Sequence, residues 1–323
     1  MFWWSYIILE FGGGLGRMFK SKLTYKNIIA VFCLIGSLVW LAAFSFPDNR
    51  LHLIFCDVGQ GDAILITQGF NQILIDGGPN DKVLACLKNN LSFFDKKLEI
   101  VALTHPDADH LTGIIPVMEK YKVDYFLIGP EGNNSAIFAA LVKKLESFCK
   151  VTPCPSTSLR VNARGRLINV YTGEKIKLGD MILEVLWPEK EWVTEQLETG
   201  IETSRFVLGA KTTNPKLNDF SLVFLLEYRE KKALLMGDAD SRVQDEIMAG
   251  NTLTSVEILK FPHHGSKTGM REDFLEKIQP KEAVISVGKN SFGHPTTEAL
   301  EMLKNEGVTV RRTDLEGEIK YTF

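Results

Sequence analysis

Four potential metal ligands fall within six residues of this chain, namely His105, Asp107, Asp109 and His110. The segment before them, 98–104, is typical of a buried strand, and the segment after them, 111–121, has apolar residues at helical spacing. Two imidazoles and two carboxylates therefore share one strand-to-helix turn, which favours a divalent metal site and more than one ion. The alternative is a helix cap at Asp109 with polar surface neighbours, but capping accounts for only one of the four residues.

Further candidate ligands each follow an apolar segment that is typical of a strand. Asp76 follows 72–75, Asp238 follows 233–236, His263 and His264 follow 256–261, and His294 lies in a glycine-rich loop after 284–287. A single Asp-Gly pair is more often a simple turn than a ligand. Because strand ends that meet at one edge of a sheet assemble loop-borne sites, the repeated pattern predicts that these side chains converge.

Strand patterns alternate with helical patterns along the chain. The predicted helices cover 82–94, 110–121, 135–149, 242–249, 271–278 and 296–306, and residues 176–187 read as a hairpin. This alternation predicts an α/β protein with helices on both sides. With 45% hydrophobic and 24% charged residues, the composition is that of an ordinary folded core.

The N-terminal region differs from the rest. The segment Ile28–Phe46 is uncharged and apolar, with basic residues before it and Asp48 after it. We predict a cytoplasmic N-terminus with one membrane anchor at 1–47, followed by an extracytoplasmic catalytic domain at 48–323. A cleaved signal peptide is the alternative, although the apolar run is long for one and no small-x-small site follows it.

Five motifs, in order, resemble one known family. They are Asp57-Val-Gly-Gln-Gly-Asp62, His105-x-Asp107-x-Asp109-His110, Asn218-Asp-Phe-Ser-Leu-Val223, Gly237-Asp238 and Pro262-His-His-Gly-Ser266. From about residue 48 onward the chain resembles the metallo-β-lactamase fold superfamily and, within it, the extracytoplasmic domain of ComEC-type DNA-uptake proteins. The Asp at 107, where the superfamily has His, is typical of the ComEC-like branch.

The resemblance implies an αββα sandwich with two metal ions at one edge. One metal is expected on His105 and Asp107 and the other on Asp109 and His110, with Asp238 bridging them. His263 completes one ligand set, and His264 is the competing choice. Supporting carboxylates are expected at Asp76, Asp57 and Asp62. Carboxylate in place of imidazole shifts the preference from Zn²⁺ towards Mn²⁺ without excluding zinc.

Residues near the metals are expected to meet the substrate and the charge of the departing group. His294 is the preferred proton donor or phosphate contact, with Lys260, Lys267 and Ser266 as alternatives. Asn218 and Ser221 belong to a motif of the resembled branch and are assigned to substrate binding. The net charge of −3 argues against a global basic field, so a DNA backbone would be guided locally, by Arg164 and Arg166.

Three function classes stay open. The first is a metal-dependent phosphodiesterase, a nuclease on single-stranded DNA outside the membrane, as the resemblance implies. The second is a hydrolase of a small ester, phosphoester or lactam, and the third is a DNA-binding domain without turnover. The sequence shows no many-helix channel of the ComEC type. We therefore expect either a natural single-span enzyme or a fragment of a split or truncated gene, with a separate channel protein as a possible partner.

The five cysteines predict no metal-binding spacing. Cys33 lies in the apolar N-terminal run. Cys56 and Cys86 sit in apolar patterns, which predicts buried thiols. Cys149 and Cys154 flank a turn and could pair outside the cell.

Overall fold

The computed structural model describes residues 25–151, 166–198, 207–214, 216–250 and 253–323. The chain divides into two compact units, Met1–Phe46 and Pro47–Phe323. In the first unit the described element is helix α1 (Tyr25–Ser45). Among the residues that were placed, no helix combines the length and the apolar character that crossing a bilayer requires. The membrane span therefore stays a prediction.

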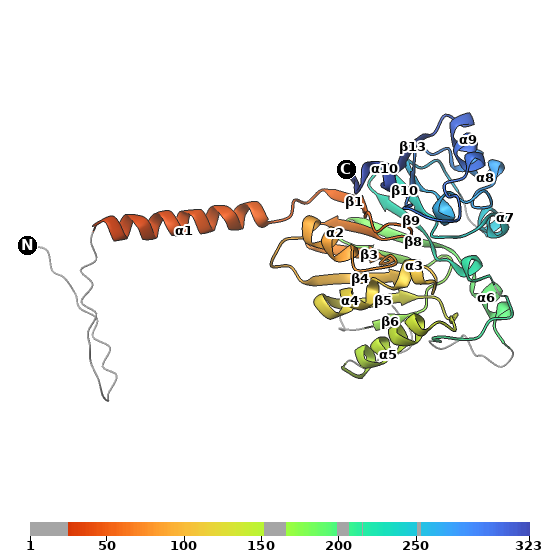
Figure 1. Cartoon of the computed structure of the whole chain (residues 1–323), viewed down its shortest axis with the longest axis horizontal. Coiled ribbons are helices and arrows are strands. Elements are labelled where there is room, and N and C mark those ends of the chain that lie inside the picture. Colours follow the sequence, from red (N-terminus) through yellow and green to blue (C-terminus); the bar gives the residue numbers. More distant parts are fainter. Residues whose placement is uncertain (1–24, 152–165, 199–206, 215, 251–252) are drawn as a thin grey trace, which may run out of the picture. The chain divides into compact units, whose positions relative to one another are not determined.

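The second unit is built on two sheets of seven strands each (Figure 1). The first sheet contains β1 (Leu51–Phe55), β2 (Ile64–Gln68), β3 (Asn71–Ile75), β4 (Lys97–Leu103), β5 (Lys122–Ile128), β6 (Arg166–Ile168) and β14 (Ile319–Thr322), in the order β14-β1-β2-β3-β4-β5-β6. The second contains β7 (Lys175–Leu178), β8 (Met181–Trp187), β9 (Val223–Tyr228), β10 (Lys231–Leu235), β11 (Ile258–Lys260), β12 (Glu282–Ile285) and β13 (Thr309–Arg312), in the order β13-β12-β11-β10-β9-β8-β7. Strands β3 to β6 and β10 to β13 run parallel within their sheets.

The core between the sheets follows the two-residue period of the strands. In β1, Leu51, Leu53 and Phe55 pack into the core that both sheets share. Ile54 and Cys56 point the other way, into the core under the helices of the first sheet. This alternation is what a strand covered on both faces requires, because successive side chains point to opposite sides.

Helices cover the outer face of each sheet (Figure 1). On the first sheet these are α2 (Val83–Asn90), α3 (Ala108–Leu111), α4 (Ile114–Lys120) and α5 (Ala136–Val151). On the second they are α7 (Ser241–Gly250), α8 (Glu272–Ile278) and α9 (Thr297–Asn305). Shorter elements are α6 (Lys190–Gln196), α10 (Thr313–Glu316) and the 3₁₀ turns η1 (Leu217–Phe220) and η2 (Pro262–Gly265). The expected two-sheet αββα arrangement is confirmed.

One predicted helix is interrupted. The pattern at 110–121 predicts a single helix, but the structure has α3 and α4 on either side of Thr112 and Gly113. Gly113 donates its N–H to the carbonyl of Gly78 at 3.0 Å, and Gly77 donates to the carbonyl of His110 at 2.7 Å. These two contacts dock the kink onto the loop after β3, which the helical period could not reveal.

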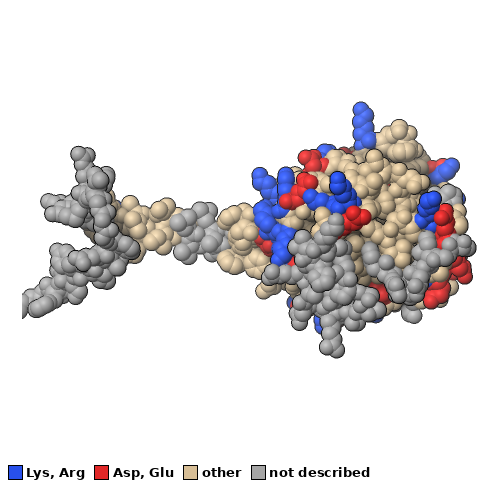
Figure 2. Space-filling model, turned by 90° about the horizontal axis from the view of Figure 1, so that it is seen from below, with Lys and Arg blue, Asp and Glu red and all other residues tan. Residues whose placement is uncertain are grey.

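Charges on the visible surface are mixed in sign. On the face drawn in Figure 2, Lys and Arg side chains stand beside Asp and Glu side chains. Ion pairs also occur in the described part of the unit, where the Lys97 ammonium lies 2.8 Å from Glu99 and 2.7 Å from Asp124. Interspersed charges of this kind create little long-range field.

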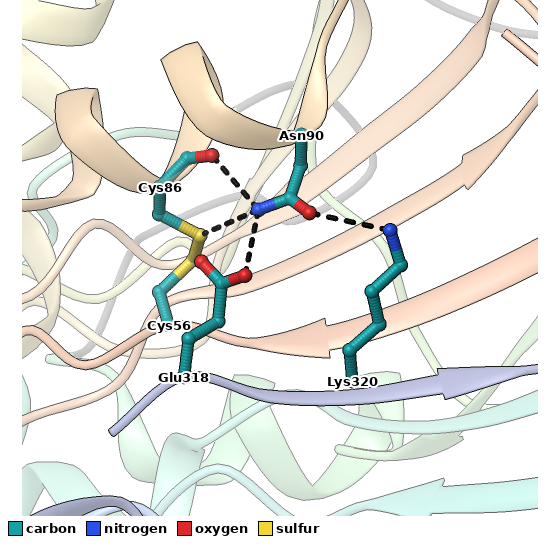
Figure 3. Close-up of a disulfide and its surroundings, with 5 residues drawn as sticks. All are labelled: Cys56, Cys86, Asn90, Glu318 and Lys320. Carbon is teal, nitrogen blue, oxygen red and sulfur yellow. Dashed lines mark hydrogen bonds between the residues drawn. A yellow bond between two sulfur atoms is a disulfide. The ribbon is translucent and has the colours of Figure 1, made fainter.

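A disulfide joins Cys56 and Cys86, which corrects the prediction of two buried thiols. Cys56 directly follows β1 and Cys86 lies in α2, so the bond ties the first strand to its covering helix. The Asn90 amide beside it donates to the Cys86 carbonyl at 3.0 Å and to the Glu318 carboxylate at 2.9 Å (Figure 3). The two cysteines are 30 residues apart, so only the sheet-to-helix packing reveals that they meet.

Candidate metal centre

Five strand ends or strand-joining loops bring polar side chains to one edge of the sandwich. Asp62 lies between β1 and β2, Asp76 follows β3, His105 follows β4, Asp238 follows β10 and His264 follows β11. The Leu222 N–H donates a hydrogen bond to the Thr104 carbonyl at 2.9 Å, which joins the end of β4 to the segment before β9. The edge is therefore shared by both sheets.

Two imidazoles of the motif are each held at Nδ1. The His110 Nδ1 lies 2.8 Å from the Asp76 carboxylate. The His105 Nδ1 lies 3.1 Å from the Thr104 hydroxyl and 3.1 Å from the Ser221 hydroxyl. Since the Thr104 hydroxyl itself donates to Asp76 at 2.7 Å, its oxygen is left to accept from His105. Both rings thus keep a proton on Nδ1 and leave Nε2 on the opposite side, where a metal ion would take the place of any Nε2 proton.

The third imidazole, His264, is held in the same way. Its Nδ1 donates to the Ser286 carbonyl at 2.8 Å. The Nε2 atoms of His105, His110 and His264 are all buried and have no hydrogen-bond partner. Buried polar atoms normally find partners, so three orphaned imidazole nitrogens facing one space are what metal ligation requires.

Carboxylates lie next to these free nitrogens. The Asp238 carboxylate lies 3.4 Å from the His110 Nε2 and 3.5 Å from the His264 Nε2. Asp109 lies 3.5 Å from the same His264 Nε2. Among the described residues, four groups of three His or Asp side chains each have their ligand atoms within 4.8 Å of one another. They are His105–His110–Asp238, Asp109–His110–His264, Asp62–Asp76–His110 and Asp62–Asp238–His264. Ligand atoms at such separations fit around ions bound at about 2.0–2.6 Å.

Asp107 stands at the rim of the cluster. Its carboxylate lies 3.5 Å from the His105 Nε2 and accepts from the Asn133 amide at 2.9 Å. Asn133 also donates to the Pro106 carbonyl at 3.0 Å. Asn133 was not singled out from the sequence. It lies in the loop after β5, and polar residues that follow strands were expected to gather at this edge. Thr104 was missed as well, although it directly precedes the motif.

A buried lysine lies behind the carboxylates. Lys260 is fully buried, and its ammonium contacts Asp62, donates to the Gly237 carbonyl at 2.8 Å and lies 3.7 Å from Asp238. A charge this deep is stable only when it is paired. The prediction that Lys260 meets the departing group is therefore corrected: its ammonium is enclosed by protein and holds Asp62 and Asp238 in place.

Neighbouring charges within the cluster shift the pKa values of its side chains. Burial would lower the pKa of His110, but Asp238 and Asp76 outweigh it and hold this pKa well above its ordinary value. Burial would likewise raise the pKa of Asp238, but His264 and His110 hold it well below its usual range. The pKa of Asp109 is lowered against the same burial penalty by His264 and His110. These carboxylates are thus anionic at neutral pH, the form that binds cations.

The consecutive residues His263 and His264 lie in different surroundings. Both residues have positive φ, 50° at His263 and 54° at His264, so consecutive side chains leave the turn in different directions. His264 enters the cluster, whereas His263 is half-buried and has the Asn218 amide nitrogen 3.3 Å from its Nδ1. The expected ligand role of His263 is therefore corrected, and the competing choice, His264, is the one the structure brings to the ligands.

Other expected site residues lie elsewhere or are engaged. Asp57 is exposed and accepts from the Gly59 N–H at 3.3 Å, so it shapes a turn outside the four candidate ligand groups. The Ser266 hydroxyl is engaged with Thr268, and Lys267 is exposed.

Some predictions concern side chains that were not placed. Arg164 and Cys154 lie outside the described residues. Arg166 begins β6 and Cys149 lies in α5, but the structure does not describe their side chains. The local basic group and the Cys149–Cys154 pair therefore stay predictions.

Comparison with known families identifies the chain. Residues 56–289 match the model of the metallo-beta-lactamase superfamily, and this range contains the His105–His110 motif, Asp238 and His264. The chain belongs to this superfamily. Members of the superfamily typically bind divalent metal ions and are hydrolases, in agreement with the side chains gathered at this edge.

Curated relatives of this metallo-beta-lactamase superfamily chain include a protein named as a competence protein. ComE operon protein 3 of Bacillus subtilis is 26% identical over 91% of this chain and 35% of the relative. Competence protein ComA of Neisseria gonorrhoeae is 33% identical over 85% of this chain and 33% of the relative. The chain thus spans about a third of the length of these relatives, and the ComEC-like resemblance is confirmed.

Solved structures resemble the fold at low identity. Zn²⁺-bound PqqB from Methylobacterium extorquens is 12% identical, with a TM-score of 0.49, over 84% of this chain and 99% of that chain. The metallo-beta-lactamase fold protein YhfI from Bacillus subtilis is 9% identical, with a TM-score of 0.47, over 84% of this chain and 100% of that chain.

Proposed function

We propose that this chain is a metal-dependent phosphodiesterase that cleaves DNA, single-stranded by preference, outside the cytoplasmic membrane. One observation carries the proposal. Three buried imidazole Nε2 atoms without hydrogen-bond partners lie beside the buried carboxylate of Asp238 and the half-buried carboxylates of Asp109 and Asp107. One relative is named as a competence protein, which supports a role in DNA uptake.

Two divalent ions, Mn²⁺ or Zn²⁺, fit these ligands. One would be held by His105, Asp107 and Asp238, and the other by Asp109, His110 and His264, with Asp238 shared. The three carboxylates make the site harder than an all-imidazole one and favour Mn²⁺. Bound there, the ions would supply hydroxide at neutral pH and stabilise charge at the phosphorus.

Protein groups around the ligands orient them and contact the substrate. Asp76, Ser221 and the Ser286 carbonyl fix the ligating rings at Nδ1. Asp62 and Lys260 form a buried pair that holds the ligand Asp238 from behind. His294, half-buried and outside the ligand groups, is proposed to contact a phosphate oxygen of the substrate as a neutral imidazole. Its pKa lies below the ordinary value because of burial and the neighbouring His263 and His264.

We also propose that the catalytic unit faces an oxidising compartment, anchored through residues 28–46. The Cys56–Cys86 disulfide supports this location, because such bonds persist outside the cytoplasm. A separate channel protein is the proposed partner for transport. Protease treatment of intact cells should remove the globular unit. If the unit survives in intact cells and is cut only after lysis, the proposed topology is wrong.

The activity is tested on the full chain, stripped of metal and reloaded with Mn²⁺, Zn²⁺ or Mg²⁺. Substrates are a labelled single-stranded oligonucleotide, bis(p-nitrophenyl) phosphate and a β-lactam. We expect metal-dependent cleavage of both phosphodiesters, loss of turnover in Asp109→Ala, and unchanged turnover in the matched control Asp57→Ala. Hydrolysis of a small ester or the lactam with no phosphodiester cleavage would favour the second function class. Binding of DNA without any turnover would favour the third.

A further inference from the structure

An exposed phenylalanine stands on the loop that follows β12, at the edge where the candidate ligands gather. Phe292 is 70% exposed, although it lies two residues from His294 in the sequence. Single exposed apolar side chains are common and carry no meaning alone. What distinguishes Phe292 is how its loop is held and what its ring adjoins.

The loop is clamped by one side chain, Asn290. Its amide oxygen accepts from the N–H groups of Phe292 at 3.0 Å and His294 at 3.1 Å. Its amide nitrogen donates to the carbonyls of Gly288 at 2.9 Å and His294 at 2.7 Å. Four hydrogen bonds to one side chain fix the backbone on both sides of Phe292. The loop therefore loses little conformational entropy when a ligand binds.

Both ends of the loop are packed against loops of the metal centre. At its start, Gly288 donates to the Gln60 side chain at 3.3 Å, in the loop that carries Asp62. At its end, Thr296 donates to the Gly265 carbonyl at 2.9 Å, directly after the candidate ligand His264. An added Cβ at Gly265 would lie 2.5 Å from Pro295, which shows how closely the two loops approach. The exposed ring is therefore held in a fixed relation to the ligands.

A row of rings leads from Phe292 towards the ligands. The ring centres of Phe292 and His294 are 5.8 Å apart, and those of His294 and His263 are 5.5 Å apart. His263 in turn lies 6.4 Å from the ligand ring of His264. Lys289, also exposed, precedes the clamp in the same loop and adds a cation for a phosphate backbone.

We propose that Phe292 is a stacking platform for an unpaired nucleobase of the strand whose phosphate lies at the metal centre. This inference rests on the proposed function and assigns its preference for unpaired strands to one residue. Aromatic side chains bind single strands by stacking on the face of a base, which is tolerant of sequence because every base has such a face. A base inside a duplex is already stacked on both faces, so the exposed ring selects unpaired bases.

The test compares Phe292→Ala with Phe292→Trp in the full Mn²⁺-loaded chain. The matched control is Phe93→Ala, because Phe93 is 73% exposed and lies on the loop between α2 and β4. The substrates are a single-stranded oligonucleotide, the same strand with abasic positions, and bis(p-nitrophenyl) phosphate. We expect Phe292→Ala to raise KM for the oligonucleotide about 10-fold, and Phe292→Trp to restore it. Phe93→Ala should match the unaltered protein on every substrate.

The substrates without bases separate stacking from a structural role. Phe292→Ala should cleave the abasic strand and bis(p-nitrophenyl) phosphate as well as the unaltered protein does. Equal losses on all three substrates, or no loss on the oligonucleotide, would overturn the platform and leave the phosphodiesterase proposal standing. If the unaltered chain cleaves no phosphodiester at all, the proposed function and this inference both fall.

Discussion

Asp76 holds the ring of the candidate ligand His110 from the side opposite to Nε2. Its carboxylate accepts from the His110 Nδ1 at 2.8 Å and from the Thr104 backbone and hydroxyl at 2.8 and 2.7 Å. Asp76→Asn keeps the shape, and Asn tolerates the positive φ of 60° at this position. The amide, however, weakens the acceptor that orients His110. We expect Mn²⁺ and Zn²⁺ affinity to fall by about 10- to 100-fold in competition with a chromophoric chelator. Unchanged affinity relative to the exposed control Asp57→Asn would contradict this role.

Glu131 makes the stability of the folded unit depend on pH. The carboxylate is fully buried, neither oxygen has a hydrogen-bond partner, and burial raises its pKa from 4.5 to about 8. The folded form therefore holds its proton more tightly than the unfolded chain does. The resulting stability is fully present below pH 4.5 and is lost as pH rises through about 8.

Replacing this carboxyl tests the assignment. Glu131→Gln stays neutral at every pH, so it should unfold at higher urea than the unaltered protein at pH 8.5 and at similar urea at pH 4.5. The difference is bounded by about 5 kcal/mol for a shift of this size. Urea midpoints measured at both pH values check the prediction. Parallel pH profiles of the two proteins would show that Glu131 does not titrate as assigned.

At the scale of elements, the approach of α4 to the loop after β3 sets the position of His110. An added Cβ at Gly113 would overlap the Gly77 carbonyl and lie 2.5 Å from the Asn80 carbonyl oxygen. Gly113→Ala must therefore push α3 and α4 away from Asp76. We expect a loss of about 1–3 kcal/mol in unfolding free energy together with weaker metal binding. Gly36→Ala is the control, because a Cβ there meets nothing within 4 Å. Full stability in Gly113→Ala would refute the close docking.

Sequence patterns predicted helices and strands correctly where the apolar residues follow a single period. The strand before His105 and the hairpin at 176–187 follow directly from apolar spacing, and the strand-end rule indicated where the polar residues gather. The pattern could not choose between His263 and His264, because the choice depends on two successive left-handed residues. Nor could it show that Lys260 is enclosed, since its neighbours Asp62 and Asp238 come from distant loops.

At the scale of the whole molecule, the Cys56–Cys86 bond links two layers of the sandwich. It closes a loop of 30 residues, and the entropy removed from the unfolded chain corresponds to about 3–4 kcal/mol. The double variant Cys56→Ala/Cys86→Ala should therefore unfold at lower urea, and reductant should shift the unaltered protein in the same direction. Cys33→Ala, which removes the exposed free thiol, should change neither. Insensitivity of the unaltered protein to reductant would argue against the bond.

The central claim is that three imidazoles and three carboxylates from both sheets hold two metal ions. Crystals of the full chain grown with Mn²⁺ and measured at the Mn absorption edge test it most directly. We predict two anomalous peaks, one beside the Nε2 of His105 and one beside the Nε2 atoms of His110 and His264. Asp238 should contact both ions, at about 2.0–2.6 Å. No peak at this edge, or ligation through His263 in place of His264, would contradict the account.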